Sequence, residues 1–482
     1  MRLTVKKFTL LYLFIVFSSS ISNAQIIPST NKITLDNIKK EYPIKSIKII
    51  GNDKTKKIII LRELSFKENQ LIDSLSLQKK IDESKINLLK LPLFNYVYFN
   101  VLKSEDYSFS IIIVVEERWY LWPEIKIINN DRNFNIWWQE KNLEKLDYRI
   151  AIKKYNALGL NHIVRAEVSF GYTKELILEY KNLFLDKFQK HFIDYKVSYF
   201  KQKQVFFQTY ENKLQAYTSD SEKAIYGFNN KLTYTYRPEF YKKHQISLSF
   251  DKISIQDSLL LLNNNFLGEN VNEKKFFSLT YRYLFDKRND RSYPTEGSWF
   301  SFEINEKGLF PNMSNNMHLL NFISTYKIFY KLNNKFFAAN SLSIKNSFDG
   351  EQQPYYFQQA LGYKYYLRGF EYYVIDGQDF YLIKNTLKFQ PFPKKISYIN
   401  FIPFKKFNKI HYTFYLNLFF ELGYVNNKYV NNELLNTLSN KMLYSSGIGF
   451  DISTYYDKVI RFEYSINQFK ESGFFIHFIA PI

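Results

Sequence analysis

The feature that most constrains the fold is a strict alternation of apolar and polar residues that recurs along most of the chain. In Gln245–Asp251 the apolar Ile246, Leu248 and Phe250 alternate with polar residues, and Phe276–Asp286 repeats the pattern with aromatic side chains. Successive side chains of a strand point to opposite faces, so each segment predicts a strand with one apolar and one polar face. A half-buried soluble sheet and a membrane barrel both satisfy this pattern.

The N-terminus and the lack of a long apolar run favour the barrel. Three cations precede an apolar core at Phe8–Phe17, and the small residues Ser22 and Ala24 suit a signal peptidase, so Met1–Ala24 is predicted to be a signal peptide. Beyond it, no run of 18 or more apolar residues offers a spanning helix. An exported chain of alternating strands therefore predicts a β-barrel, and an aromatic content of 19% suits strands and membrane-interface girdles.

Sixteen segments have the character of strands, an even number, as expected of a single-chain bacterial barrel. They begin near Leu121, Lys145, His162, Lys174, Phe192, Ala224, Gln245, Lys275, Ser298, Met317, Phe336, Gln378, His411, Met442, Lys458 and Gly473. Short turns such as Asn156–Asn161 and Lys331–Lys335 fall on one side, and longer loops such as Gln256–Lys274 and Ser347–Gly377 fall on the other. The connection Gln390–Ile410 is long for the side on which it falls, and the pattern does not explain it.

The residues before the barrel have a different pattern. The expected order is strand, helix, helix, strand, strand, over Ile44–Ile49, Thr55–Leu64 with Thr55 as its cap, Leu75–Leu91, Tyr96–Lys103 and Phe109–Glu116. We therefore predict an all-β, transmembrane, sixteen-stranded antiparallel barrel with one small N-terminal α+β domain. The expected boundaries are 1–24 for the signal peptide, 25–41 for a linker, 42–118 for the domain and 119–482 for the barrel.

Charge and composition give few signs of catalysis or nucleic-acid binding. The formal charge is +20, but the lysines are scattered rather than gathered in a stripe, which favours lipid headgroups, a positive lumen or compositional bias over nucleic acid. Cysteine is absent, and the six histidines show no metal-ligand spacing. We expect no enzyme activity, catalytic residue, metal or cofactor. A Ser/His pair assembled from distant strands is the alternative left open.

Several charged motifs occur in a fixed order along the later part of the chain. The loop Ser347–Gly377 carries Tyr366-Leu367-Arg368-Gly369-Phe370, and an earlier turn carries Asp286, Arg288, Pro294 and Gly297. The later strands carry Phe419-Phe420-Glu421-Leu422-Gly423, Ser445-Ser446-Gly447-Ile448-Gly449 and Arg461-Phe462-Glu463-Tyr464. Period-2 geometry sends Glu421, Asp451, Arg461 and Glu463 to the polar face together with Gly447 and Gly449, where glycines would leave room for a loop tip.

These motifs resemble the BamA/TamA family of outer-membrane barrels, and the β-α-α-β-β order resembles that family's periplasmic POTRA domain. The resemblance implies that Arg368, Gly369 and Phe370 enter the lumen, where Glu421 and Glu463 would pair with the guanidinium. We call these five residues the loop lock. Asp286, Arg288, Pro294 and Gly297 would form a periplasmic turn. In the strand after the loop, Thr386-Leu387-Lys388-Phe389 lacks an acidic residue often found in related chains, so the ion-pair network is expected to be smaller.

The function implied by the resemblance is insertion or translocation of other polypeptides at the outer membrane. Clients would enter between the first strand, Leu121–Ile128, and the last, Gly473–Ala480, after reception by the periplasmic domain. The expected partners are unfolded outer-membrane or secreted polypeptides, outer-membrane lipids and accessory lipoproteins, with no nucleic acid. A two-partner secretion pore for a dedicated client, and a passive channel or structural barrel, are the alternatives.

Overall fold

The computed structural model describes residues 41–104, 108–129, 137, 141, 143–186, 190–221, 223–313, 317–348, 351–398, 409–454 and 458–478. The predicted signal peptide and all but the last residue of the predicted linker lie outside these residues. None of the helices that the described residues form is long and apolar enough to cross a membrane.

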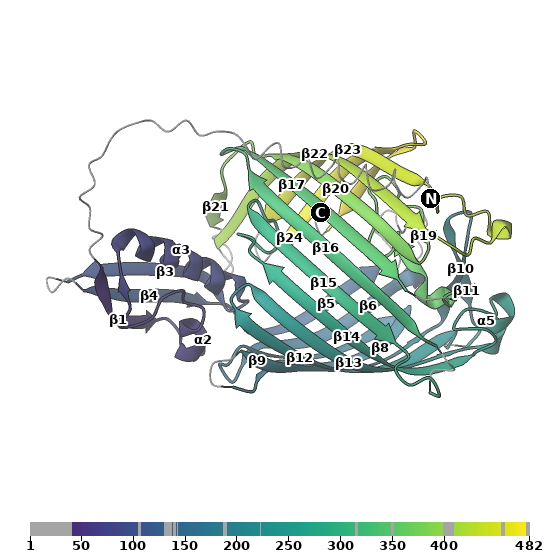
Figure 1. Cartoon of the computed structure of the whole chain (residues 1–482), viewed down its shortest axis with the longest axis horizontal. Coiled ribbons are helices and arrows are strands. Elements are labelled where there is room, and N and C mark those ends of the chain that lie inside the picture. The colour runs from purple at the N-terminus through teal and green to yellow at the C-terminus, as the bar shows by residue number, and fades with distance from the viewer. Residues whose placement is uncertain are drawn as a thin grey trace. The chain divides into compact units, whose positions relative to one another are not determined.

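A closed antiparallel barrel forms most of the molecule (Figure 1). Its sixteen main strands are β5 (Leu121–Asn129), β6 (Leu146–Ala157), β7 (His162–Gly171), β8 (Thr173–Phe184), β9 (His191–Gln202), β12 (Ile225–Glu239), β13 (Lys242–Ile255), β14 (Glu273–Asp286), β15 (Gly297–Lys307), β16 (Leu319–Lys331), β17 (Phe336–Ser347), β20 (Asp379–Phe389), β22 (Lys409–Asn426), β23 (Met442–Thr454), β24 (Lys458–Asn467) and β25 (Ser472–His477). Each pairs with the next in the chain, and β25 lies beside β5 to close the sheet. All sixteen predicted strands are present, which confirms the predicted fold class.

The barrel has its apolar face outside and its polar face inside. Along β22, Leu416, Leu418 and Phe420 are about half exposed, whereas Asn417 and Glu421 are buried at 3% and 0% exposure. A soluble sheet would bury the leucines instead, so this distribution distinguishes a membrane barrel from a half-buried soluble sheet.

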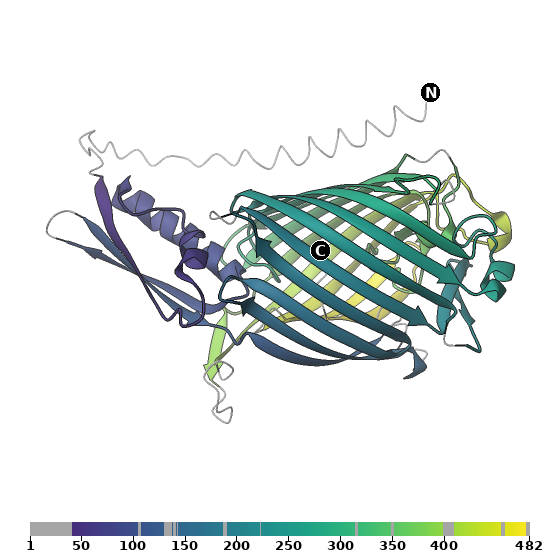
Figure 2. The same cartoon turned by 90° about the horizontal axis from the view of Figure 1, so that it is seen from below.

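A short extra strand accounts for part of the long connection that the sequence pattern left unexplained. Strand β21 (Lys395–Tyr398) pairs with Lys409–Tyr412, the first residues of β22, whereas β20 pairs with Leu416–Asn426 further along it. The connection is therefore a hairpin that extends one end of β22, and it can be followed in Figure 2 as the light green strand at the end of the barrel. Residues 399–408 lie outside the described part.

Two other strand pairs were not predicted. The hairpin of β10 (Gln204–Tyr210) and β11 (Lys213–Thr218) forms its own two-stranded sheet, and β18 (Gln359–Leu361) pairs with β19 (Ile375–Asp376) inside the long loop. At the tip of the hairpin, the side-chain oxygen of Asn212 accepts a hydrogen bond from the Leu438 amide, and its backbone carbonyl accepts another from the Val374 amide. The hairpin thus holds two loops at the same end of the barrel.

The N-terminal part of the described chain is a small α+β domain. It consists of β1 (Tyr42–Ile50), α2 (Lys57–Leu61), β2 (Leu71–Ile72), α3 (Ser74–Lys90), β3 (Phe94–Lys103) and β4 (Phe109–Glu117), with the sheet order β2-β1-β4-β3. Asp73 caps α3 by accepting from two backbone amides of its first turn, and the helix ends just before Pro92. Leu77 and Ile81 of α3 are buried in one apolar cluster with Ile111 of β4.

The expectation that Thr55 caps the first helix was wrong. The helix begins at Lys57 after Lys56, which makes no side-chain cap, and it ends at Leu61 rather than Leu64. The Thr55 hydroxyl instead donates to the carboxylate of Glu117 (2.6 Å), a contact between residues 62 positions apart. Local capping preference cannot foresee such a long-range partner.

Candidate functional site

The long loop between β17 and β20 carries Arg368 into the barrel, where its side chain is fully buried. The backbone turns at Gly369 with φ of +79°, and a Cβ there would lie 3.1 Å from the Cβ of Ser445. The left-handed conformation therefore favours glycine, and the absence of a side chain also avoids a tight contact with β23. Phe370 follows in the apolar cluster of the loop.

The Arg368 guanidinium has a partner on every side. Its Nε donates to Oε1 of Glu421, one terminal nitrogen donates to Oε2 of Glu463 (3.2 Å), and the other donates to the hydroxyl of Thr386 (3.1 Å). The Arg368 amide adds a bond to Glu421 (3.0 Å), and the Phe419 ring lies 3.7 Å from the guanidinium carbon. A buried guanidinium is stable only when it is paired and hydrogen-bonded in this way. The structure thus brings together all five residues of the loop lock; that they act as a lock stays a prediction.

The strand after the loop contributes a hydroxyl and a cation in place of the missing carboxylate. Besides Thr386, the ammonium of Lys384 lies 3.4 Å from Oε2 of Glu421. Glu421 therefore lies between two cations, Arg368 and Lys384. This strand therefore contributes an ammonium and a hydroxyl to the network, where an acidic residue would contribute a carboxylate.

Gly447 and Gly449 were expected to leave room for the loop tip, but they make room for side chains of the neighbouring strand β22. A Cβ at Gly447 would lie 2.7 Å from the Phe419 ring, so Gly447 makes room for the ring that stacks on Arg368. Gly449 makes room for an asparagine of β22 in the same way. Gly423 is the strand glycine that faces the loop, where a Cβ would lie 3.2 Å from Leu361 and 3.4 Å from Leu367.

A second buried network lies on the same strands. Arg461 donates two hydrogen bonds to the carboxylate of Asp451 (2.6 and 2.7 Å), and the Tyr293 hydroxyl donates to the same carboxylate (2.6 Å). Because Arg461 also lies 4.0 Å from Glu463, the second network continues into the loop lock.

The turn Asp286–Gly297 supplies Tyr293 to that network. At the start of the turn, Arg288 donates two hydrogen bonds to Asp286 (2.9 and 2.7 Å). Gly297 ends it with φ of +99°, where a Cβ would lie 2.2 Å from the carbonyl of Lys287. The turn is thus held by hydrogen bonds at its start, and it is joined to the long loop through Asp451, Arg461 and Glu463.

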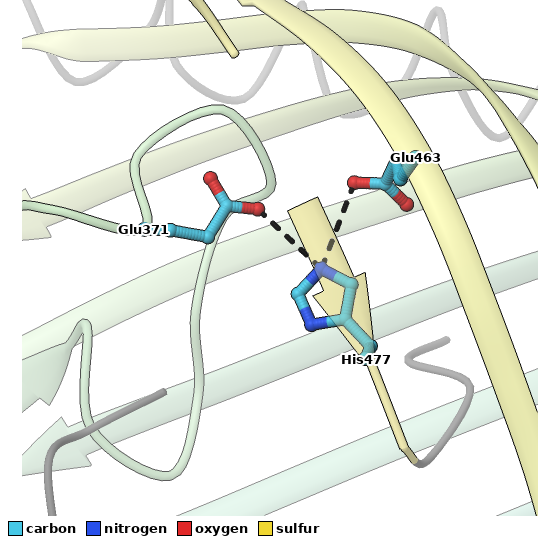
Figure 3. Close-up of side chains that lie close together, drawn as sticks. All are labelled: Glu371, Glu463 and His477. Carbon is cyan, nitrogen blue, oxygen red and sulfur yellow. Dashed lines mark ion pairs between the residues drawn. The ribbon is translucent and has the colours of Figure 1, made fainter. Parts of the chain in front are cut away.

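A third group contains a possible metal-ligand set that the sequence did not reveal (Figure 3). Glu371 from the loop, Glu463 from β24 and His477 from β25 each present a ligand atom, and the three atoms lie within 4.8 Å of one another. All three residues are buried. Burial, and next the charge of Glu463, raise the pKa of Glu371 well above its usual range.

The N-terminal domain and the barrel belong to one compact unit that begins at Tyr42, and charged contacts join them. Arg237 of β12 donates to both carboxylate oxygens of Glu63 (2.7 and 2.8 Å). Burial alone would raise the pKa of Glu63, but the guanidinium groups of Arg237 and Arg62 hold it below its usual range. A further contact is made by Lys90, whose ammonium donates to the backbone carbonyl of Asp286 (3.3 Å).

Sequence reasoning missed Tyr293, Arg237, Glu371 and His477 as site residues. Tyr293 lies next to Pro294 in the predicted turn, and its hydroxyl partner is 158 residues away. The alternation along β25 could have predicted that His477 faces the lumen, because it lies opposite the lumen residue Arg461 in the register of β24 and β25.

Comparisons with known proteins agree with this architecture. BamA from Haemophilus ducreyi lacking POTRA domains 1–3 superposes with a TM-score of 0.52 at 16% identity, covering 90% of this chain and 83% of that one. CdiB from Escherichia coli gives a TM-score of 0.55 at 12% identity, covering 92% and 75%. No protein-family model matches the chain, and a search of curated proteins found no match. The chain has the fold of the BamA-type β-barrel proteins, as the motifs predicted.

Proposed function

We propose that this chain is an outer-membrane protein that inserts other polypeptides into the membrane or translocates them across it, without a nucleotide or cofactor. The observation that carries the proposal is the loop lock: an arginine from a long loop, fully buried in a closed barrel and bound to carboxylates from β22 and β24. The fold shared with BamA and CdiB supports this class over a structural barrel.

Client entry is proposed at the junction of β25 and β5, which we call the seam. In the described residues β25 spans six residues, whereas β22 spans 18. Pro123 in β5 has no amide hydrogen, so it removes one backbone donor from that strand. A short strand beside a proline-containing one leaves fewer hydrogen bonds to separate than elsewhere in the sheet, so a client strand can pair there.

The small domain is proposed to lie in the periplasm, to act as a POTRA domain and to receive unfolded clients. Its sheet order leaves β3 at an edge, where an extended polypeptide can add as another strand. Outer-membrane lipids would surround the apolar face of the barrel. Accessory lipoproteins are the remaining proposed partners.

Photo-crosslinking at the outer face of the barrel tests client entry. A photoreactive residue is placed at Ile125 of β5 or Phe474 of β25, both strongly exposed, and at Phe420 of β22 as a matched control on the same face. Cells are pulse-labelled while they export outer-membrane proteins, and the crosslinked products are identified by mass spectrometry. We expect newly exported chains at the two seam positions and none at Phe420.

Equal crosslinking at all three positions, or at none, contradicts entry at the seam. Crosslinks from a photoreactive residue at Tyr366, which lies on the loop inside the barrel, would instead favour the two-partner secretion pore. A client of such a pore crosses through the lumen and has to displace the loop.

A further inference from the structure

We propose that Glu371, Glu463 and His477 bind one divalent transition-metal ion, with Zn²⁺ as the best fit. We call these three residues the lumen cluster. They come from the loop, from β24 and from β25 (Figure 3). The sequence gives no metal-ligand spacing because Glu371 and His477 lie more than a hundred residues apart.

The spacing of the ligand atoms suits a shared ion better than direct hydrogen bonds. The Nε2 atom of His477 lies 3.7 Å from Oε1 of Glu371 and 3.9 Å from Oε1 of Glu463. Hydrogen bonds between such atoms span about 2.7–3.2 Å, so neither contact is one. Ligand atoms bound about 2.1 Å from a tetrahedral ion lie about 3.4 Å apart, so the two separations from Nε2 are within about 0.5 Å of that value, and all three ligand atoms lie within 4.8 Å of one another.

Two of the three ligand atoms are buried without a hydrogen bond. Within the described residues, Oε1 of Glu463 and Nε2 of His477 have no hydrogen-bond partner, and their side chains are 0% and 8% exposed. Leaving a buried acceptor unsatisfied costs about 1–3 kcal/mol, and more for a charged group. A bound cation satisfies both atoms at once.

The donor set indicates the kind of ion. One imidazole nitrogen and two carboxylate oxygens suit Zn²⁺, whereas Mg²⁺ prefers oxygen ligands alone in near-octahedral geometry. The arginines do not occupy the ligand atom, because Arg368 and Arg461 both approach Oε2 of Glu463. They orient that carboxylate from behind, as partners outside the coordination sphere commonly do.

An ion bound here would join the lumen loop to the last strand of the barrel. Glu371 lies three residues beyond Arg368, and His477 is the last residue of β25. The ion would therefore hold β25 in place from inside the barrel. One further consequence rests on the proposed function: if clients enter at the seam, the ion would also stabilise the closed seam.

The test measures metal binding by the full-length protein without any client. The protein is purified in detergent, freed of affinity tag and metal, dialysed against buffered Zn²⁺ with excess Mg²⁺, and measured by elemental mass spectrometry. We expect about one Zn²⁺ per chain in the wild type and loss of that ion in Glu371→Gln and His477→Gln. Zn²⁺ should also raise the unfolding temperature of the wild type and not of these variants.

The matched control is His318→Gln, which removes an exposed histidine 3.2 Å from Glu306 and should keep the ion. Glu371→Gln keeps the proposal testable should His477→Gln fail to fold, because Glu371 lies outside the strand ladder. Wild-type protein without stoichiometric Zn²⁺, or full Zn²⁺ retention in folded Glu371→Gln, would overturn the proposal. Neither result bears on seam entry, which the crosslinks test separately.

Discussion

At the scale of single residues, the buried charges form one connected series. Lys384 and Arg368 flank Glu421, and Arg368 and Arg461 flank Glu463. Each cation thus has a carboxylate neighbour that shields it from the cost of burial. Removing one member leaves its partners uncompensated, and this typically costs about 3–5 kcal/mol in a buried pair.

Truncation of Arg368 should release the loop before it unfolds the barrel. The strand ladders do not depend on that side chain, so Arg368→Ala is expected to keep the β-sheet circular dichroism signal, to raise hydrogen exchange in the loop and to lose activity. The matched control is Arg282→Ala, which removes an arginine paired with Glu303 across β14 and β15, where both side chains are partly exposed. It should have little effect on the loop.

A charge exchange tests whether the pairing itself matters. Arg368→Glu should inactivate the protein, and either Glu421→Arg or Glu463→Arg, added to it, should recover part of the activity. Should neither double variant exceed Arg368→Glu alone, the pairing is not the mechanism.

The face of the strand on which a residue lies was predictable from the sequence, and the residues that it contacts were not. Alternation along a strand was enough to send Glu421 and Glu463 to the lumen. It could not show that Gly447 accommodates Phe419, because that contact depends on the register between two strands. The same limit applies to Tyr293, whose acceptor lies on β23.

At the scale of elements, the long barrel strands were fully predictable because each carries several periods of alternation. The β10–β11 hairpin and β21 were missed, and both are short. The β10–β11 hairpin forms a sheet of its own, and β21 pairs only with the first four residues of β22, so neither has the long run of alternation that marks the main strands. Short irregular elements are fixed by contacts with distant loops, such as Asn212 with Leu438.

Edge strand β3 of the small domain is expected to bind clients through its backbone. Neighbouring residues of an antiparallel strand direct their amides to opposite sides, so of Asn100 and Val101 one amide faces β4 and the other faces the open edge. Proline at the open-edge position should weaken client crosslinking in a correctly inserted protein, because it removes only the outward donor. The control is proline at the other position, which should instead destabilise the domain.

Unchanged client crosslinking with the outward donor removed would count against strand addition. The sequence alone did not say which strand is the edge. The sheet order β2-β1-β4-β3 places β3 at one edge with ten residues, whereas β2 at the opposite edge has only two and pairs with only the first two residues of β1.

At the scale of the whole molecule, the barrel should have one end at the cell surface and the other in the periplasm. Epitope tags after Leu261 in α5 (Asp257–Leu262) and after Gln352 should be reachable on intact cells, whereas a tag after Leu332 should be reachable only after permeabilisation. All three positions are exposed in the structure, so differences in labelling would reflect the membrane and not local burial. Surface labelling of a tag after Leu332 on intact cells would contradict this orientation of the barrel in the membrane.

The position of the loop also limits where such a tag can go. Residues around Arg368 are buried, so a tag there would displace the loop lock and not report topology. The exposed part of the loop near Gln352 avoids this problem.

The order of residues along the chain has a consequence for how the protein itself matures. Arg368 precedes its partners Glu421 and Glu463 by 53 and 95 residues, and Tyr293 precedes Asp451 by 158. Contacts between such distant residues form late, because the intervening chain has to be ordered first. We therefore expect the loop to complete its docking only when β22 and β24, which carry the two glutamates, have joined the sheet.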